Sequence, residues 1–298
     1  MRTWWSRSSL PQWLDMSDRC DPQGAELIDA HVHVFPPEVV RRRVEYLDRD
    51  ERFKQLYSEP AARMASAEQV LEHMDQGGVD LSVIFGFAFR DLGLCREVND
   101  YVIEAVGSHP GRLAGLACVP LGDAGAAAEL ERCLEAGMRG CGELAPAADS
   151  ADMDALRDLA CHLRERGLPL LIHASEPVGH TYPGKGAFTP EACVALAESC
   201  PGVTMVLAHF GGGLFAYELM PEVRQALSTV VYDTAAMPYL YDPKVYEAVA
   251  LIAGPQKLLF GSDYPLLPSV RCLEGLDRLP AESQEAIRSG NARRVYGV

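Results

Sequence analysis

The chain has 298 residues, is 48% hydrophobic and carries a formal net charge of −15. This length suits one large core, since an eightfold barrel takes about 250 residues, whereas the acidic charge disfavours nucleic acid and anionic membranes as partners. No apolar run reaches the ~18 residues of a membrane span. The nine cysteines form no CxxC pair, so we expect reduced thiols and a cytoplasmic protein.

Short apolar runs alternate with helical patterns along the chain. The predicted strands are Leu27–Val34, Val79–Phe85, Leu113–Val119, Met138–Leu144, Leu170–Ala174, Thr204–His209, Val230–Thr234 and Lys257–Asp263. The predicted helices are Ala67–Gly77, Leu94–Gly107, Ala124–Ala136, Asp152–Arg166, Pro190–Ser199, Pro221–Leu227, Pro243–Ile252 and Ser283–Tyr296. Eight such units predict an α/β fold, a closed (β/α)8 TIM-like barrel. A Rossmann sheet is disfavoured because no glycine-rich turn follows the first strand.

Three segments lie outside this repeat. Residues 1–25 form an N-terminal extension, so the barrel domain is expected over residues 26–298. A long charged loop, residues 35–66, follows the first strand and is either a solvated helix or a lid over the catalytic face. The third segment, Ser175–Thr189, overhangs the same face. Its His180 and Lys185 are either solvated or bind an anionic group of a substrate.

The strongest chemical signal is the run Asp29-Ala30-His31-Val32-His33. His31 and His33 point to one side of a strand because side chains i and i+2 share a face. An isolated pair of this kind is as often two packed or surface histidines. Here three further strands end in His173, His209 and Asp263, and the carboxyl ends of barrel strands surround one pocket. These residues therefore predict a site for a divalent metal.

Glu143 ends the fourth predicted strand at the same edge of the barrel. A buried carboxylate there needs a cation or a metal as partner. It either bridges two metal ions or pairs with an arginine or a histidine outside the metal's own ligands. The sequence thus leaves the number of ions at one or two.

Five short motifs resemble those of the amidohydrolase superfamily, specifically its amidohydrolase-related (amidohydrolase-2) branch. They are Ile28-Asp29-Ala30-His31-Val32-His33, Leu171-Ile172-His173, Ala208-His209-Phe210-Gly211-Gly212, Gly261-Ser262-Asp263-Tyr264-Pro265 and Asn291-Ala292-Arg293-Arg294-Val295-Tyr296-Gly297. The resemblance implies a distorted barrel and a metal of the zinc type. It implies the ligands His31, His33, His173 and Asp263, and a role for His209 as ligand or acid–base residue. Decarboxylases of this branch generally lack a carboxylate on strand four, so Glu143 departs from their pattern.

We therefore expect a metal-dependent hydrolase that acts on a lactone, amide or ester through an activated water. Asp263 would take a proton from the water, and His209 would polarise the carbonyl or support a second ion. The first alternative is a non-oxidative decarboxylase of a small aromatic or unsaturated acid, in which His209 protonates the carbon that loses CO₂. The second is a ligand-binding barrel without catalysis. The expected partner is a small-molecule substrate, and a homodimer is left open.

Overall fold

The computed structural model describes residues 25–298, so the predicted extension at residues 1–25 lies outside the described residues except for Ala25. Eight parallel strands form two sheets, ordered β1-β2-β3 and β4-β5-β6-β7-β8. The strands are β1 (Ile28–His33), β2 (Leu81–Phe85), β3 (Leu113–Gly115), β4 (Cys141–Leu144), β5 (Leu170–Ile172), β6 (Met205–Leu207), β7 (Val230–Asp233) and β8 (Leu258–Leu259).

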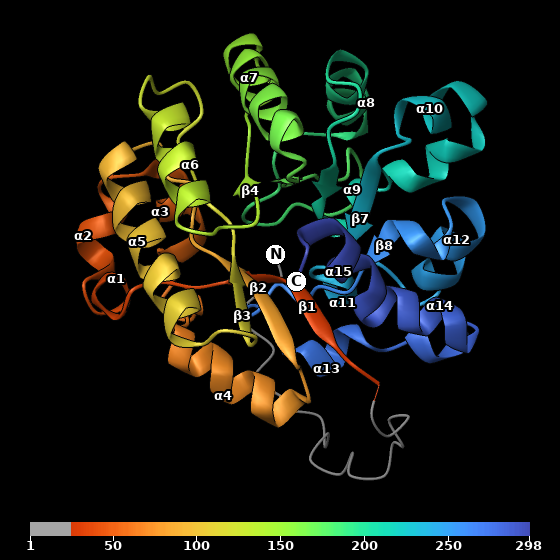
Figure 1. The fold of residues 1–298 in the computed structure, drawn as a ribbon, viewed down its shortest axis with the longest axis horizontal. Helices are drawn as coiled ribbons and strands as arrows, with labels where there is room; N and C mark the ends of the chain where they lie inside the picture. The colour runs from red at the N-terminus through yellow and green to blue at the C-terminus, as the bar shows by residue number, and fades with distance from the viewer. Residues whose placement is uncertain (1–24) are drawn as a thin grey trace.

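Two single bridges join the sheets into a barrel, Val32 with Tyr264 and Ala117 with Cys141. The Ala30 N–H also donates to the Phe260 carbonyl at 2.8 Å, which continues the contact between the first and last strands. The predicted (β/α)8 barrel is therefore confirmed, and Figure 1 shows its strands at the centre with the helices around them. The barrel is distorted because β3 and β4, and likewise β8 and β1, are joined by single bridges rather than by continuous strand pairing.

The helices follow the predicted order. They are α1 (Pro37–Arg41), α2 (Arg43–Leu47), α3 (Glu51–Tyr57), α4 (Ala67–Gly77), α5 (Leu92–Ser108), α6 (Ala126–Glu135), α7 (Ser150–Arg166), α8 (Pro190–Ser199), α9 (Ala208–Gly211), α10 (Pro221–Ala226), α11 (Met237–Leu240), α12 (Val245–Ile252), α13 (Ser269–Cys272), α14 (Ala281–Glu285) and α15 (Asn291–Tyr296). Helix α4 has the predicted bounds because Ser66 and Gln69 form a capping box at its start and Gly78 ends it with φ 64°.

Several strands are shorter than predicted. β2 and β4 begin later than predicted, whereas β6 and β8 stop early, at the catalytic end. Strand β6 stops at Leu207 because His209 and Phe210 adopt left-handed φ angles of 58° and 57° in a tight turn. Strand β8 stops at Leu259, and Asp263 beyond it has φ 66°. Such angles are costly for residues other than glycine and are found mainly at functional sites.

Two apolar layers hold the barrel together. The inner layer is formed by side chains that point into the barrel, including Ile28, Val83 and Leu171, and α15 adds Val295 and Tyr296 to it. The outer layer lies between the strands and the surrounding helices, where most of the buried hydrophobic residues are found. Both faces of the strands are covered, as the apolar runs in the sequence predict.

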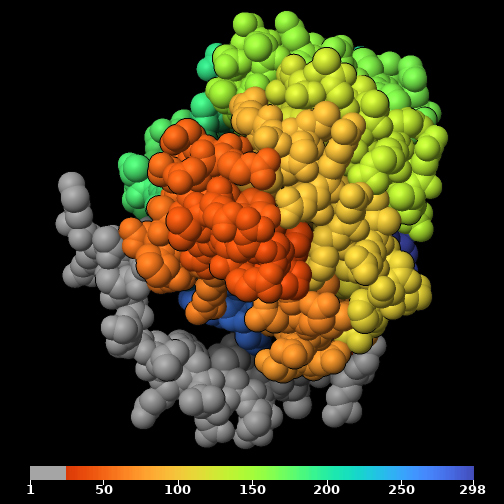
Figure 2. All heavy atoms as spheres, turned by 90° about the vertical axis from the view of Figure 1, so that its left-hand side faces the viewer, coloured from red at the N-terminus to blue at the C-terminus, as the bar shows by residue number. Residues whose placement is uncertain are grey.

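The charged insertion after β1 folds into three short helices, α1, α2 and α3, rather than one solvated helix. It has a core of its own, in which Phe35, Tyr46 and Phe53 pack against Phe89 and Leu94 from the β2–α5 region. Figure 2 shows the insertion as a continuous red and orange surface beside α4 and α5. This packing fixes the insertion against the barrel, as a lid over the catalytic face requires.

Two properties of the described residues bear on the setting of the protein. None of the helices within residues 25–298 combines the length and the apolar character needed to cross a bilayer. The cysteines in this part of the chain are all free thiols, and all but Cys161 are buried.

Candidate metal centre and substrate pocket

An irregularity in β1 turns its histidines into the barrel. Ile28 and Ala30 belong to the inner layer, whereas Val32 belongs to the outer one. The pairing register with β2 shifts between Asp29 and Val32, which changes the face that the following residues present. His31 and His33 therefore lie together at the barrel mouth, with ring centroids 5.3 Å apart.

Three histidines of the site are held through the same ring nitrogen. Nδ1 of His31 lies 2.8 Å from Asp233 Oδ2, Nδ1 of His33 lies 3.2 Å from the Gly86 carbonyl, and Nδ1 of His209 lies 3.0 Å from the Ala235 carbonyl. Each contact favours the tautomer that carries its proton on Nδ1. The Nε2 atoms thus point to the carboxylates of the two ligand groups, which is the arrangement of a metal-binding histidine.

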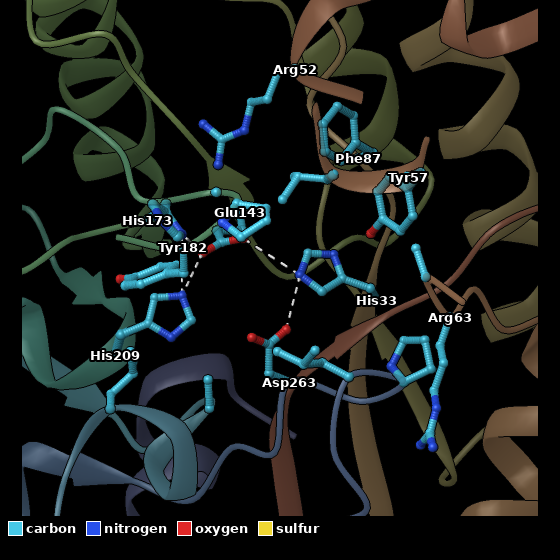
Figure 3. Close-up of a pocket in the computed structure, with 18 residues that line it drawn as sticks. His33, Arg52, Tyr57, Arg63, Phe87, Glu143, His173, Tyr182, His209 and Asp263 are labelled. Atoms are coloured by element: carbon cyan, nitrogen blue, oxygen red, sulfur yellow. Dashed lines mark hydrogen bonds and ion pairs between the residues drawn. The ribbon is translucent and has the colours of Figure 1, made fainter. Parts of the chain in front are cut away.

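The predicted ligands converge at one end of the barrel but form two groups. Figure 3 shows Glu143, His173 and His209 of one group, and His33 and Asp263 of the other. The first group is His31, His33 and Asp263; the Asp263 Oδ1 atom lies 3.8 Å and 3.5 Å from the two Nε2 atoms. The second group is Glu143, His173 and His209. Here Glu143 Oε1 lies 2.9 Å from His173 Nδ1 and 3.5 Å from His209 Nε2. His173, which the resemblance placed with the first group, lies in the second.

Both groups have the dimensions of a metal site. Ligands about 2.1 Å from a tetrahedral ion lie about 3.4 Å from one another, close to the observed separations. His31 Nε2 is buried and has no hydrogen-bond partner among the described residues, an unfavourable state that a bound cation would relieve. The residues present therefore fit a divalent ion.

Glu143, a member of the second group, also lies beside the first. Its Oε2 is 3.5 Å from His33 Nε2, while its Oε1 contacts His173 and His209. Burial opposes ionisation of this carboxyl, but the neighbouring histidines, His173 first, outweigh burial and hold its pKa well below the usual value. A permanently charged carboxylate in this position could contact a metal ion in either group.

The charges of the site also raise the pKa values of two histidines. Burial acts to lower the pKa of His31, yet the Asp233 charge and hydrogen bond raise it to about 9. Burial likewise opposes charge on His209, and the bond to Glu143 with the charge of Asp263 raises its pKa to about 10. Without metal, these two imidazoles hold protons at neutral pH, so a metal ion must displace protons to bind.

Two buried aspartates support the site and were missed as site residues by sequence reasoning. Asp233 binds His31 through Oδ2 and accepts the His209 backbone N–H through Oδ1 at 2.9 Å. Asp29 accepts the backbone N–H and the hydroxyl of Ser262, which fixes the residue before Asp263. Asp233 lies within a predicted strand near its carboxyl end, the same signal that marked Asp263, so it could have been found.

A cavity of about 140 Å³ opens over the metal groups. This volume is close to that of the ~150 Å³ cavity that accommodates benzene in an engineered protein, so one six-membered ring fits. Its apolar walls include Leu56, Tyr57, Phe87, Leu240 and Leu266. The insertion supplies Arg52, Leu56, Tyr57, Ala62 and Arg63 to the lining, which agrees with the lid hypothesis for residues 35–66.

Arg52 is one of two arginines in the cavity lining that the sequence did not single out; the other is Arg63. The Nη1 of Arg52 donates to the Ala145 carbonyl at 3.1 Å, and no carboxylate of residues 25–298 forms an ion pair with Arg52. Burial lowers its pKa, while the charge of Glu143 acts in the opposite direction. A guanidinium that faces an apolar cavity without a counter-ion can bind the acid group of a ligand.

The two residues predicted to bind an anionic group lie differently. His180 and Lys185 do not line the cavity, whereas Tyr182, Pro183 and Gly184 from the same loop do. Lys185 Nζ donates to the carbonyls of Val178 and His180 at 2.6 Å and 3.2 Å. The loop thus reaches the pocket through Tyr182, whose hydroxyl donates to Glu176 at 2.9 Å.

Comparison with known proteins places the chain in a family. The family model described as Amidohydrolase matches residues 28–298, nearly the whole chain. The chain therefore belongs to the amidohydrolase family and is an enzyme of that family. Family membership together with the two ligand groups supports a divalent-metal site at the mouth of the barrel.

Two of the proteins to which the chain is similar are decarboxylases of aromatic acids. A 6-methylsalicylic acid decarboxylase from Penicillium expansum is 28% identical over 177 residues, 48% of this chain and 54% of that protein, so the match spans about half of the relative. The structure of 5-carboxyvanillate decarboxylase from Novosphingobium aromaticivorans with manganese and 4-hydroxy-3-methoxy-5-nitrobenzoic acid has a TM-score of 0.70 at 17% identity, covering 93% of this chain and 97% of that one.

A hydrolase is also similar in fold. A probable 2-pyrone-4,6-dicarboxylic acid hydrolase from Acinetobacter baumannii, with citric acid bound, has a TM-score of 0.58 at 17% identity and covers 92% of this chain and 100% of that one. At such identities the two structures show the fold alone. The curated relative that matches in sequence is a decarboxylase, and the decarboxylase structure has the higher TM-score of the two. The comparisons therefore favour our decarboxylase alternative over the hydrolase that we expected first.

Replacing Asp233 with asparagine should weaken metal binding. The new side-chain amide would donate to His31 Nδ1, which shifts the imidazole proton to Nε2 and blocks the nitrogen that faces the pocket. Loss of such an outer partner typically costs about 10–100-fold in metal affinity, measurable by competition with a fluorescent chelator. Asp242→Asn, at an exposed aspartate, is the matched control. Equal affinity in Asp233→Asn and the control would contradict the role of Asp233.

Proposed function

We propose that the protein is a metal-dependent, non-oxidative decarboxylase of a small ring-bearing carboxylic acid. The observation that carries the proposal is Arg52, a guanidinium without a carboxylate partner in the described chain, which faces a cavity of one-ring size above the metal groups. An acid is the ligand that such a cavity favours. The similarity to decarboxylases of aromatic acids supports the same reaction class.

The residues of the chain have separate roles in this proposal. Arg52 binds an acid group of the substrate, and Tyr57 and Phe87 pack against its ring. His31, His33 and Asp263 would hold a divalent ion, which would supply a Lewis acid for an oxygen of the substrate. His209 donates its Nε2 proton to the ring carbon that carries the carboxylate. The bond to the carboxylate then breaks, its electron pair returns to the ring, and CO₂ leaves.

His209 suits the role of proton donor. Its Nε2 faces the pocket and its Nδ1 is held by the Ala235 carbonyl, so the ring cannot turn away. Its left-handed backbone fixes the imidazole at the end of β6, and its raised pKa keeps it protonated in the metal-free site at neutral pH. His173, 3.1 Å from this Nε2, lies on the path by which the proton can be replaced.

The identity and number of the ions are part of the proposal. We propose one ion for the decarboxylase, held in the first group, with Glu143, His173 and His209 left free to handle protons. Zinc is the metal that the sequence resemblance implies, whereas manganese is bound in the decarboxylase from Novosphingobium aromaticivorans. Elemental analysis of the freshly purified protein, followed by activity after reconstitution with each metal, separates the two.

A panel of acids tests the proposed reaction. Metal-replete protein is incubated with salicylate, 6-methylsalicylate, 2,6-dihydroxybenzoate and unsaturated ring acids, alongside lactones and small amides. We expect CO₂ release from at least one acid and no turnover of the lactones and amides. Turnover of a lactone or amide without CO₂ release from any acid would contradict the proposal and favour hydrolysis.

Arg52→Gln should impair substrate binding more than chemistry. The carboxylate loses its charge as CO₂ forms, so an ion pair with it is made mainly in the ground state. We therefore expect KM to rise about tenfold or more while kcat falls less than about threefold. Arg49→Gln is the matched control, because Arg49 lies in the same insertion but pairs with Asp91 at the surface. A fall in kcat at constant KM in Arg52→Gln would argue against the anchoring role.

Hydrolysis remains the second candidate because of the position of Glu143. If a second ion occupies the group Glu143, His173 and His209, the carboxylate bridges two ions and His209 is a ligand rather than an acid. Asp263 would then take a proton from the attacking water. This candidate predicts two ions per chain in metal-loaded protein and fewer in Glu143→Gln. A single ion far from Glu143 in an anomalous-scattering map would refute it.

The other expectations stay within the proposal. The protein is proposed to act on a small molecule, without nucleic acid or membrane as partner, in the cytoplasm and with a homodimer still open. His180 and Lys185 keep their predicted substrate contact only if the Ser175–Thr189 loop rearranges when substrate binds. The extension before residue 26 is proposed to lie outside the catalytic domain.

A further inference from the structure

The arginines of the insertion differ in their partners. Three pair with carboxylates: Arg41 with Glu38, Arg42 with Glu45, and Arg49 with Asp91. The other three are Arg43, Arg52 and Arg63, and no carboxylate of residues 25–298 forms an ion pair with them. These same three line cavities, Arg52 the catalytic one, Arg43 a neighbouring one, and Arg63 both.

The neighbouring cavity has a volume of about 350 Å³ and lies against the catalytic one, with which it shares three wall residues. The shared residues are Ala62, Arg63 and Pro265. No aspartate or glutamate of the described chain lines it, although the protein as a whole has 42 acidic and 27 basic residues. A positive cavity in an acidic protein concentrates anions locally.

The polar lining of this cavity consists largely of donors. Arg43 donates to the Glu59 carbonyl through Nη1 at 3.2 Å. Its Nε and Nη2 groups take no part in that bond. Gln69 accepts the Ser66 N–H through Oε1 at 3.0 Å, so its amide NH₂ remains a donor. Figure 3 places Arg63 well apart from Arg52 among the residues that line the catalytic pocket. The two arginines therefore lie at different parts of the lining.

We propose that this neighbouring cavity binds a second anionic group of the substrate. The substrate is then a ring acid that carries a carboxylate or phosphate on a flexible arm, with the ring over the metal groups and the arm between Arg63 and Arg43. This inference rests on the proposed function for the position of the ring. It adds the substrate class: a compound with two separated negative charges, selected over acids with one.

Matched ligands test the second charge. Benzoates are prepared with a 3-position chain of two, four or six carbons, ending either in a carboxylate or in the neutral primary amide. Binding to manganese-loaded protein is measured by calorimetry. For at least one chain length we expect the carboxylate to bind about tenfold or more tightly than its amide. The preference should shrink as salt is raised, because partly exposed charges are screened.

Variants assign the preference to the cavity. Arg63→Gln and Arg43→Gln should each reduce the carboxylate-to-amide ratio to below about threefold. Arg43→Gln should also bind benzoate as before, because Arg43 does not line the catalytic cavity. Arg41→Gln is the matched control and should keep the ratio, because Arg41 pairs with Glu38 and lines neither cavity. A phosphate-ended chain tests whether the larger anion is preferred over the carboxylate.

Two results would overturn the inference. Equal binding of carboxylate and amide at every chain length would show that the cavity does not select charge. A preference that persists in the Arg43→Gln, Arg63→Gln double variant would place its origin elsewhere. Failure of the proposed function gives a different result. Benzoate itself would then not bind, or its binding would not change in Arg52→Gln, whichever chain ends are preferred.

Discussion

His31→Ala is expected to lose both the bound metal and the activity. Its Nε2 is a buried nitrogen without a hydrogen-bond partner in the described chain, and a cation in the first group would give it a direct ligand contact. A direct ligand should matter more than an outer partner, so we expect metal affinity to fall by more than about 100-fold. Asp263→Asn should lose activity too, because a neutral amide replaces the only carboxylate of the group.

The measurement is metal content by mass spectrometry, with kcat/KM determined in parallel. His162→Ala is the matched control: His162 is a half-buried histidine that pairs with Glu131, away from the pocket. Circular dichroism of each variant separates loss of metal from loss of fold. Full metal content in a His31→Ala, His33→Ala double variant would refute the first group as the metal site.

His209→Asn should retain the metal and lose turnover. Asparagine tolerates the left-handed backbone that His209 adopts, so the end of β6 should keep its shape. It cannot donate an acidic proton, and the loss of a general acid typically costs about 10²–10⁴-fold in rate. We therefore expect kcat to fall in that range while one ion per chain remains.

This variant also separates the two candidate reactions. A hydrolase with two ions would lose the second ion in His209→Asn, since His209 would be one of its ligands. Metal content that falls from two ions to one would therefore contradict the decarboxylase account. An unchanged kcat would also contradict this account, because His209 would then not be the proton donor. His162→Asn serves as the control for both readouts.

Sequence reasoning predicted the barrel because its signal repeats. Eight apolar runs with ligand-type residues at their ends gave the strands and the edge at which they meet, and α4 and α8 have the predicted bounds. The predicted bounds were wrong at the ends of β6 and β8, where His209, Phe210 and Asp263 leave the extended conformation. Periodicity does not encode these turns, because they depend on contacts with neighbouring strands.

The parts of the site that escaped prediction depend on tertiary structure. Arg52 is one charged residue among many in the insertion, and only the fold shows that it faces a cavity without a carboxylate partner. The division of the ligands into two groups, with His173 beside Glu143 and His209, likewise depends on the positions of several strands. His180 and Lys185 were chosen by residue type, and the loop instead lines the pocket with Tyr182.

The fate of isotopes in one reaction tests the central claim most directly. Manganese- or zinc-replete protein is incubated with ring acids, lactone acids among them, that are labelled with ¹³C in the carboxyl group. The solvent is a mixture of D₂O and H₂¹⁸O, and the products are read by NMR and mass spectrometry. We predict release of the ¹³C label as CO₂, one deuterium on the ring carbon that carried it, and no such deuterium with His209→Asn. A product that keeps its ¹³C and gains ¹⁸O in a new carboxyl group would contradict decarboxylation and identify the enzyme as a hydrolase.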